Sequence, residues 1–123
     1  MVSAKDKVTR WFFVLAWMAF MFFLSNQPGL KSSFEPIVDF ILRKLAHLTE
    51  YFILAWLLYR ALSLSAGKKQ ALVWTLVLAF VFALSDEWHQ TFVRQRNGNP
   101  RDVGIDLVGI LAAVYWLKVR FFK

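Results

Sequence analysis

Apolar residues occupy long blocks of this chain, and polar residues gather at the ends of the blocks. The first block, Trp11 to Leu24, runs for 14 residues without a polar side chain. We expect a helix from about Val8 to Asn26, because that length crosses an apolar layer of roughly 30 Å at about 1.5 Å per residue. A basic start before such a block is also typical of a signal peptide, but no small-x-small cleavage site follows, so we favour an uncleaved helix.

Pro28-Gly29 ends this first helix. The stretch from Phe34 to Lys44 mixes charged and apolar residues, and it predicts a short interfacial helix that feeds the next span. The second span is predicted from Leu45 to Leu64, although it contains several polar side chains. The pattern here is the weakest of the four, because its unbroken apolar run is short.

Two further spans follow. The third is predicted from Ala71 to Val93 and is apolar as far as Leu84. The fourth runs from about Val103 to Leu117, after an Asn-Pro pair that is typical of a helix start. The chain therefore predicts an all-α fold, a four-helix transmembrane bundle with a short interfacial helix before the second span, in a single domain over residues 1–123.

Composition supports a membrane protein. The chain is 59% hydrophobic and 18% aromatic, whereas soluble domains are about 45–50% apolar. It contains no cysteine, which excludes disulfides and thiolate metal sites. The net charge is +7, but the basic residues flank the apolar blocks and form no single patch, so we expect no nucleic-acid partner.

The distribution of charge also predicts an orientation. With four spans, the side that holds both termini carries nine basic residues: Lys5, Lys7, Arg10, Arg60, Lys68, Lys69, Lys118, Arg120 and Lys123. The other side carries six: Lys31, Arg43, Lys44, Arg94, Arg96 and Arg101. The positive-inside rule then places both termini in the cytoplasm. All the acidic residues except Asp6 lie toward the outer side.

Polar side chains from three predicted helices fall at a similar depth near this outer side. His47 and Tyr51 are four residues apart and share a helix face, with Glu50 beside them. Glu87 and Gln90 share a stripe on the third span. An ionisable group in the apolar layer costs about 2.5–3.5 kcal/mol, so we expect these side chains to face one another.

Simpler explanations exist for several polar residues. Asp102 would serve only as a capping residue at the start of the fourth helix. Asp86 and His89 would lie in the headgroup layer, where polar side chains are common. Arg94 and Arg101 would bind lipid phosphates.

Tyr51 and Trp88 would be interface aromatics or packing residues. His47 and Glu87 are harder to explain in this way, because they lie closer to apolar sequence. Two histidines and several carboxylates can hold a divalent ion, but no His-x-x-x-His or similar motif is present, so we predict no metal and no cofactor. No P-loop or serine elbow appears either.

Two segments resemble the signatures of the VanZ-like family. Lys44-Leu45-Ala46-His47-Leu48-Thr49-Glu50-Tyr51 resembles its Lys-x-x-His-x-x-x-Tyr segment. The second signature is matched by Glu87, Gln90 and Phe92, followed by Arg96, Asp102 and Gly109. The resemblance covers nearly the whole chain and implies a small multi-pass protein of the bacterial cytoplasmic membrane. The family is named for a protein linked to teicoplanin resistance, and the resemblance supplies no reaction.

Two positions depart from the family pattern. Arg43 stands where the family usually has an acid, which removes a salt bridge. Asp106 stands where it usually has Asn, which adds a negative charge to the polar cluster.

These features lead to three hypotheses. The first is a protein that binds an anionic envelope lipid or a polyprenyl-phosphate-type precursor, with a site opening at the outer leaflet between the second, third and fourth helices. Its ligand-binding residues would be Lys44, His47, Tyr51, Glu87, Gln90, Arg96, Asp102 and Asp106. The second is a membrane-embedded hydrolase or transferase acting on a lipid head group, with His47 or Glu87 as general base. The third is a structural or accessory subunit. A homo-oligomer is compatible with each of these hypotheses. A transporter is a further possibility, and four short helices would have to form an oligomer to serve as one.

Overall fold

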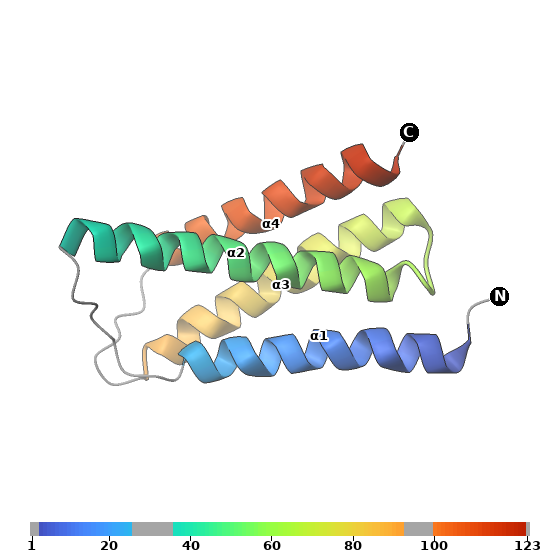
Figure 1. Ribbon diagram of the computed structural model, residues 1–123, viewed down its shortest axis with the longest axis horizontal. Helices are drawn as coiled ribbons and strands as arrows, with labels where there is room; N and C mark the ends of the chain where they lie inside the picture. The colour runs from blue at the N-terminus through green and yellow to red at the C-terminus, as the bar shows by residue number, and fades with distance from the viewer. Residues whose placement is uncertain (1–2, 26–35, 93–99, 123) are drawn as a thin grey trace.

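A computed structural model of the chain shows four helices in a bundle. It describes residues 3–25, 36–92 and 100–122. The helices are α1 (Ala4–Ser25), α2 (Pro36–Leu62), α3 (Lys68–Gln90) and α4 (Pro100–Phe121). No strand occurs in these ranges. Each helix runs antiparallel to the next one in the sequence, so α1 begins at the same end of the bundle where α4 finishes (Figure 1). The all-α four-helix prediction is confirmed.

The predicted interfacial helix is not a separate element. Residues from Pro36 to Lys44 form the first turns of α2, which continues without a break to Leu62. The charged residues in this stretch do not interrupt the helix because a charged side chain leaves the backbone hydrogen bonds of a helix intact. Pro36 and Pro100 occupy the first positions of α2 and α4, where a missing N–H leaves no helical hydrogen bond unmade.

α2 supplies the centre of the bundle. Its buried face consists of Tyr51, Leu54, Ala55, Leu58 and Ala61, which recur at intervals of three and four residues. α1 and α4 flank α2 on opposite sides, and α3 crosses behind it (Figure 1). α2 packs most closely against α4, and α1 packs mainly against α2.

Small side chains line the interior faces of α3 and α4. Ala71, Ala79 and Ala83 on α3 and Ala113 on α4 are fully buried. Large apolar side chains point outward, and they include the following exposed residues: Phe12, Phe13, Phe23, Val73, Trp74, Val81, Tyr115 and Val119. This arrangement is typical of helices in lipid, where small residues let backbones approach and apolar side chains face the hydrocarbon.

Among the residues that the structure describes, two stretches are long and apolar enough to cross a membrane, Ala4–Leu24 and Lys68–His89. Only 11% of the first apolar window and 33% of the second are buried. A core helix of a soluble protein would instead be buried along most of its length. The two helices therefore fit a membrane protein.

Candidate functional site

The two ends of the bundle differ in chemistry. At the end where α1 begins, the Arg10 guanidinium donates to the carbonyl of Arg60 at 2.8 Å, and Lys68 Nζ donates to the carbonyl of Phe121 at 3.1 Å. These cations satisfy carbonyls at the C-terminal ends of α2 and α4, which have no partner within their own helices. Buried acidic side chains lie toward the opposite end.

His47 on α2 and Asp106 on α4 form the first contact of this polar cluster. His47 Nδ1 lies 3.1 Å from Asp106 Oδ1. The two side chains are 18% and 3% exposed, so the pair is largely removed from solvent. A histidine that carries a proton on Nδ1 donates it to the carboxylate, which fixes the orientation of the ring and leaves Nε2 for another partner.

Tyr51 and Asp86 form the second contact, one turn further along α2. The Tyr51 hydroxyl donates to Asp86 Oδ2 at 3.3 Å, and the two residues are 0% and 8% exposed. The ring of Phe82 packs edge-on against Tyr51. The hydroxyl also lies within electrostatic range of Asp106, so the two contacts belong to one cluster that joins α2, α3 and α4.

A close approach of α4 to α2 makes the first contact possible. A Cβ atom on Gly109 would lie only 2.8 Å from the backbone carbonyl oxygen of Leu48. Glycine is therefore required at this crossing. Gly109 lies one turn after Asp106, and Leu48 follows His47, so the crossing sets the distance between the two polar side chains.

The structure brings together three of the residues predicted from the sequence: His47, Tyr51 and Asp106. Lys44 and Glu87 are half-buried and each makes a further contact.

The remaining predicted residues cannot be placed in the cluster. Gln90 and Asp102 belong to α3 and α4, but their side chains lie outside the described part of the chain. Arg96 lies between the described segments 36–92 and 100–122, as does Arg94.

Asp86 is the residue that the sequence reading undervalued. The sequence places it in the headgroup layer and outside the predicted ligand-binding set, yet it is buried and accepts a hydrogen bond from Tyr51. A signal for it exists in the sequence, because Thr75, Ala79 and Ala83 precede it at steps of four, four and three. Such a stripe of small residues marks the packed face of a membrane helix.

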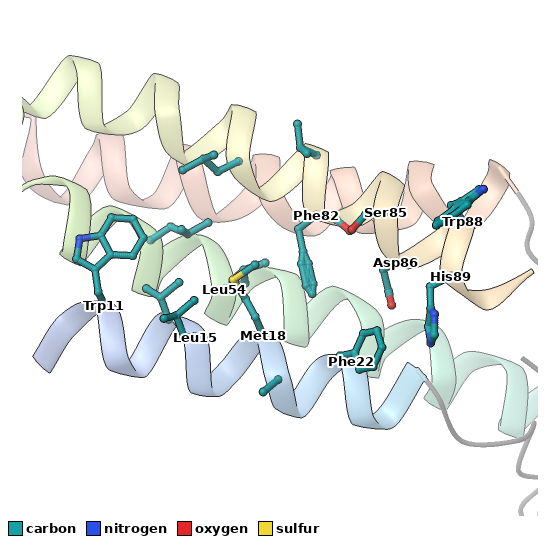
Figure 2. Close-up of a pocket in the computed structure, with 15 residues that line it drawn as sticks. Trp11, Leu15, Met18, Phe22, Leu54, Phe82, Ser85, Asp86, Trp88 and His89 are labelled. Atoms are coloured by element: carbon teal, nitrogen blue, oxygen red, sulfur yellow. The ribbon is translucent and has the colours of Figure 1, made fainter. Parts of the chain in front are cut away.

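A groove of about 710 Å³ lies between α1 and α3 and reaches Asp86 and His89 at its polar end (Figure 2). The ring of His89 stacks on Phe22 with centroids 4.4 Å apart. Neither Asp86 Oδ1 nor His89 Nε2 has a hydrogen-bond partner among the residues that the structure describes. The lining includes none of Lys44, His47, Tyr51, Glu87 or Asp106, so Asp86 connects the groove with the cluster behind it.

Within the segments that the structure describes, no group of three or more His, Cys, Asp or Glu side chains is arranged to hold a metal ion. What the cluster offers instead is a buried set of hydrogen-bonding groups: two carboxylates, an imidazole and a phenol. Such a set can orient a polar head group or a neighbouring cation, or move a proton between bound groups.

A four-helix bundle with an apolar exterior and a buried polar cluster defines the class, a small helical protein suited to a membrane. A family model described as VanZ/LLP1 matches residues 10–122, so the chain belongs to this family and the resemblance seen in its two signatures is confirmed. Neither the comparison with curated proteins nor that with solved structures gave a match.

Proposed function

We propose that this chain is an integral protein of the bacterial cytoplasmic membrane that binds an anionic lipid or lipid-linked precursor at the outer face. All four helices cross the bilayer, and both termini lie in the cytoplasm. The observation that carries the proposal is the burial of Asp86 and Asp106 in one cluster at a single end of the bundle. Membrane proteins keep ionisable groups at such depth mainly where a ligand or ion pathway uses them.

The asymmetry of the two ends supports the orientation. Arg10, Lys68 and Lys69 lie at the end that also holds the last turn of α4. The acidic cluster lies toward the other end. Basic residues concentrate on the cytoplasmic side of membrane proteins, so the cluster faces outward.

The ligand chemistry follows from the need to balance the buried carboxylates. Lys44, one turn before His47, and Arg96, in the connection to α4, are two of the cations close to the cluster in sequence. The carboxylates orient these cations, and the cations in turn bind a phosphate or carboxylate of the ligand. Arginine suits this role because its planar guanidinium donates two parallel hydrogen bonds.

Replacing Arg96 with Gln tests the proposal. The protein is purified in a mild detergent, and co-purifying phospholipid and polyprenyl phosphate are quantified by mass spectrometry. We expect Arg96→Gln to lower the occupancy of anionic lipid about tenfold, because one charge-assisted contact is worth about 1.5–3 kcal/mol. Arg120→Gln, at an exposed site on the opposite end, is the matched control and retains its lipid. Equal occupancy in both variants would count against the proposal.

A second candidate function is hydrolysis or transfer at a lipid head group. The His47–Asp106 contact of 3.1 Å favours it, because a histidine oriented by a carboxylate is a common general base. Under this alternative, His47→Gln abolishes turnover of the co-purified lipid and leaves its binding intact. Loss of binding together with turnover, or the absence of any turnover in the unmodified protein, rules the alternative out.

A further inference from the structure

The groove between α1 and α3 has the shape of a site for a single apolar chain. Its lining comes mainly from α1 and α3 (Figure 2), and it includes Leu54 and Leu58 of α2. Its lining on α1 extends from Trp11 to Phe22, which is roughly 16 Å at about 1.5 Å per residue. A volume of about 710 Å³ lies inside the range of about 300–1,000 Å³ that is usual for ligand pockets.

One end of the groove is polar, and its polar atoms lack partners. Asp86 is 8% exposed, and it projects from α3 toward α1 together with His89 (Figure 2). Tyr51 satisfies only Oδ2 of this carboxylate, while Oδ1 has no hydrogen-bond partner in the described segments 3–25, 36–92 and 100–122. A buried carboxylate oxygen without a donor is costly, so a ligand that supplies one is stabilised at this position.

We infer that this groove binds one apolar chain of a membrane lipid whose head presents a hydrogen-bond donor, a hydroxyl or an ammonium, to Asp86 Oδ1. His89 Nε2 provides a second polar contact. A carboxylate at the head position repels phosphate and attracts a donor, so the ligand differs in chemistry from the anionic lipid of the proposed function. The two sites share Asp86 and otherwise differ in place, because the groove lies among α1, α2 and α3 and the cluster lies among α2, α3 and α4.

A single acyl or isoprenoid chain matches the apolar walls of the groove, and a lipid head group can supply the hydrogen-bond donor that Asp86 Oδ1 lacks among the described residues, which a helix of apolar side chains does not present. A transmembrane helix from a second copy or another protein is the alternative occupant, and a change of oligomeric state in Ala19→Trp would reveal it.

Filling the groove tests the inference. Ala19 lines it from α1 and is exposed, and Ala112 is an exposed alanine on α4 away from it. Ala19→Trp and Ala112→Trp therefore make a matched pair. Delipidated protein in detergent is titrated with monopalmitoylglycerol, hexadecylamine and methyl palmitate, and the bound fraction is measured by native mass spectrometry. The first two probes separate a hydroxyl from an ammonium head, and the ester carries no donor.

We expect the unmodified protein and Ala112→Trp to bind a donor-bearing probe about tenfold more tightly than methyl palmitate. Ala19→Trp should lose this binding, and Asp86→Leu should bind the donor-bearing probe no better than the ester. Equal binding by the two Trp variants overturns the inference. So does equal affinity for all three probes in the unmodified protein, or a change of oligomeric state in Ala19→Trp without a change in probe binding.

The result is independent of the Arg96→Gln experiment. If Ala19→Trp leaves the probes bound while Arg96→Gln loses anionic lipid, the groove is not a site and the proposed function stands. The reverse pattern supports the groove and contradicts the outer-face anion site.

Discussion

Asp86 has two carboxylate oxygens in different surroundings. Oδ2 accepts a hydrogen bond from Tyr51 inside the bundle, whereas Oδ1 has no partner among the described residues, and Asp86 also lines the groove. At the scale of single residues, this carboxylate is therefore the point where the buried cluster meets the apolar groove. The free energy cost of burying this carboxylate is offset in part by the hydrogen bond from the Tyr51 hydroxyl.

Replacing Tyr51 with Phe removes that hydroxyl and keeps the ring that packs on Phe82. We expect Tyr51→Phe to lower the free energy of unfolding by about 1–3 kcal/mol, because it leaves a buried carboxylate unsatisfied. Unfolding by SDS, followed by circular dichroism, measures the change. Tyr115→Phe is the control, since Tyr115 is 71% exposed and its removal should be nearly neutral. Equal stability in both variants would mean that the Tyr51–Asp86 contact contributes nothing.

At the scale of elements, the pairing of α2 with α4 positions the cluster. Gly109 lets the α4 backbone approach Leu48 on α2, and the same approach places Asp106 against His47. α1 is held to α2 in a different way, through a hydrogen bond of 3.0 Å from Trp17 Nε1 to the carbonyl of Glu50. Helix association in this protein therefore combines backbone proximity with a few polar contacts.

A methyl group at Gly109 should force α2 and α4 apart. We expect Gly109→Ala to destabilise the protein by about 1–3 kcal/mol, the usual cost of overpacking, since the added Cβ meets backbone and not a movable side chain. Gly104→Ala on the same helix meets nothing within 4 Å, so it should be neutral or stabilising by up to about 1 kcal/mol through helix propensity. Thermal unfolding of both proteins in detergent distinguishes them, and an equally stable Gly109→Ala would show that the crossing is loose.

At the scale of the whole molecule, basic contacts close one end of the bundle and acidic side chains gather toward the other. Arg10 and Lys68 hold the ends of α2 and α4 at the basic end. This asymmetry is what the proposed orientation in the membrane depends on.

Single cysteines can test that orientation without background labelling, because the chain contains none. Lys69 is exposed at the start of α3, and Thr91 is exposed just beyond its end. We expect Thr91→Cys to react with a membrane-impermeant maleimide in intact cells, whereas Lys69→Cys should react only after the membrane is opened. The opposite labelling pattern would mean that the protein has the reverse orientation in the membrane. Labelling of both positions in intact cells would contradict a crossing by α3.

Much of the fold could be predicted from the four apolar blocks. The predicted first helix, about Val8 to Asn26, agrees with α1 apart from an earlier start, and its last residue lies outside the described segments. The third and fourth spans match α3 and α4 within a few residues at the ends that the structure describes. The exception is the separate interfacial helix, which the sequence suggested because charges accompany apolar residues from Phe34 to Lys44.

The candidate site was only partly predictable. His47 was predicted because ionisable side chains are costly beside apolar sequence, and Asp106 was predicted as a departure from the family pattern that adds a charge to the cluster. Neither the choice of Asp86 over Glu87 as the buried partner of Tyr51 nor the groove beside α1 was predicted.

The sequence alone determined that four apolar helices form, because the length and composition of each block are local properties. Tertiary structure alone decided which face of each helix turns inward. A helix that is apolar on nearly every side gains little from burying one face and not another when its surroundings are also apolar. Two features of the packed bundle determine the inward face. One is where two helix backbones can approach closely, as at Gly109, and the other is which polar side chains can then form a hydrogen bond, as Tyr51 does with Asp86.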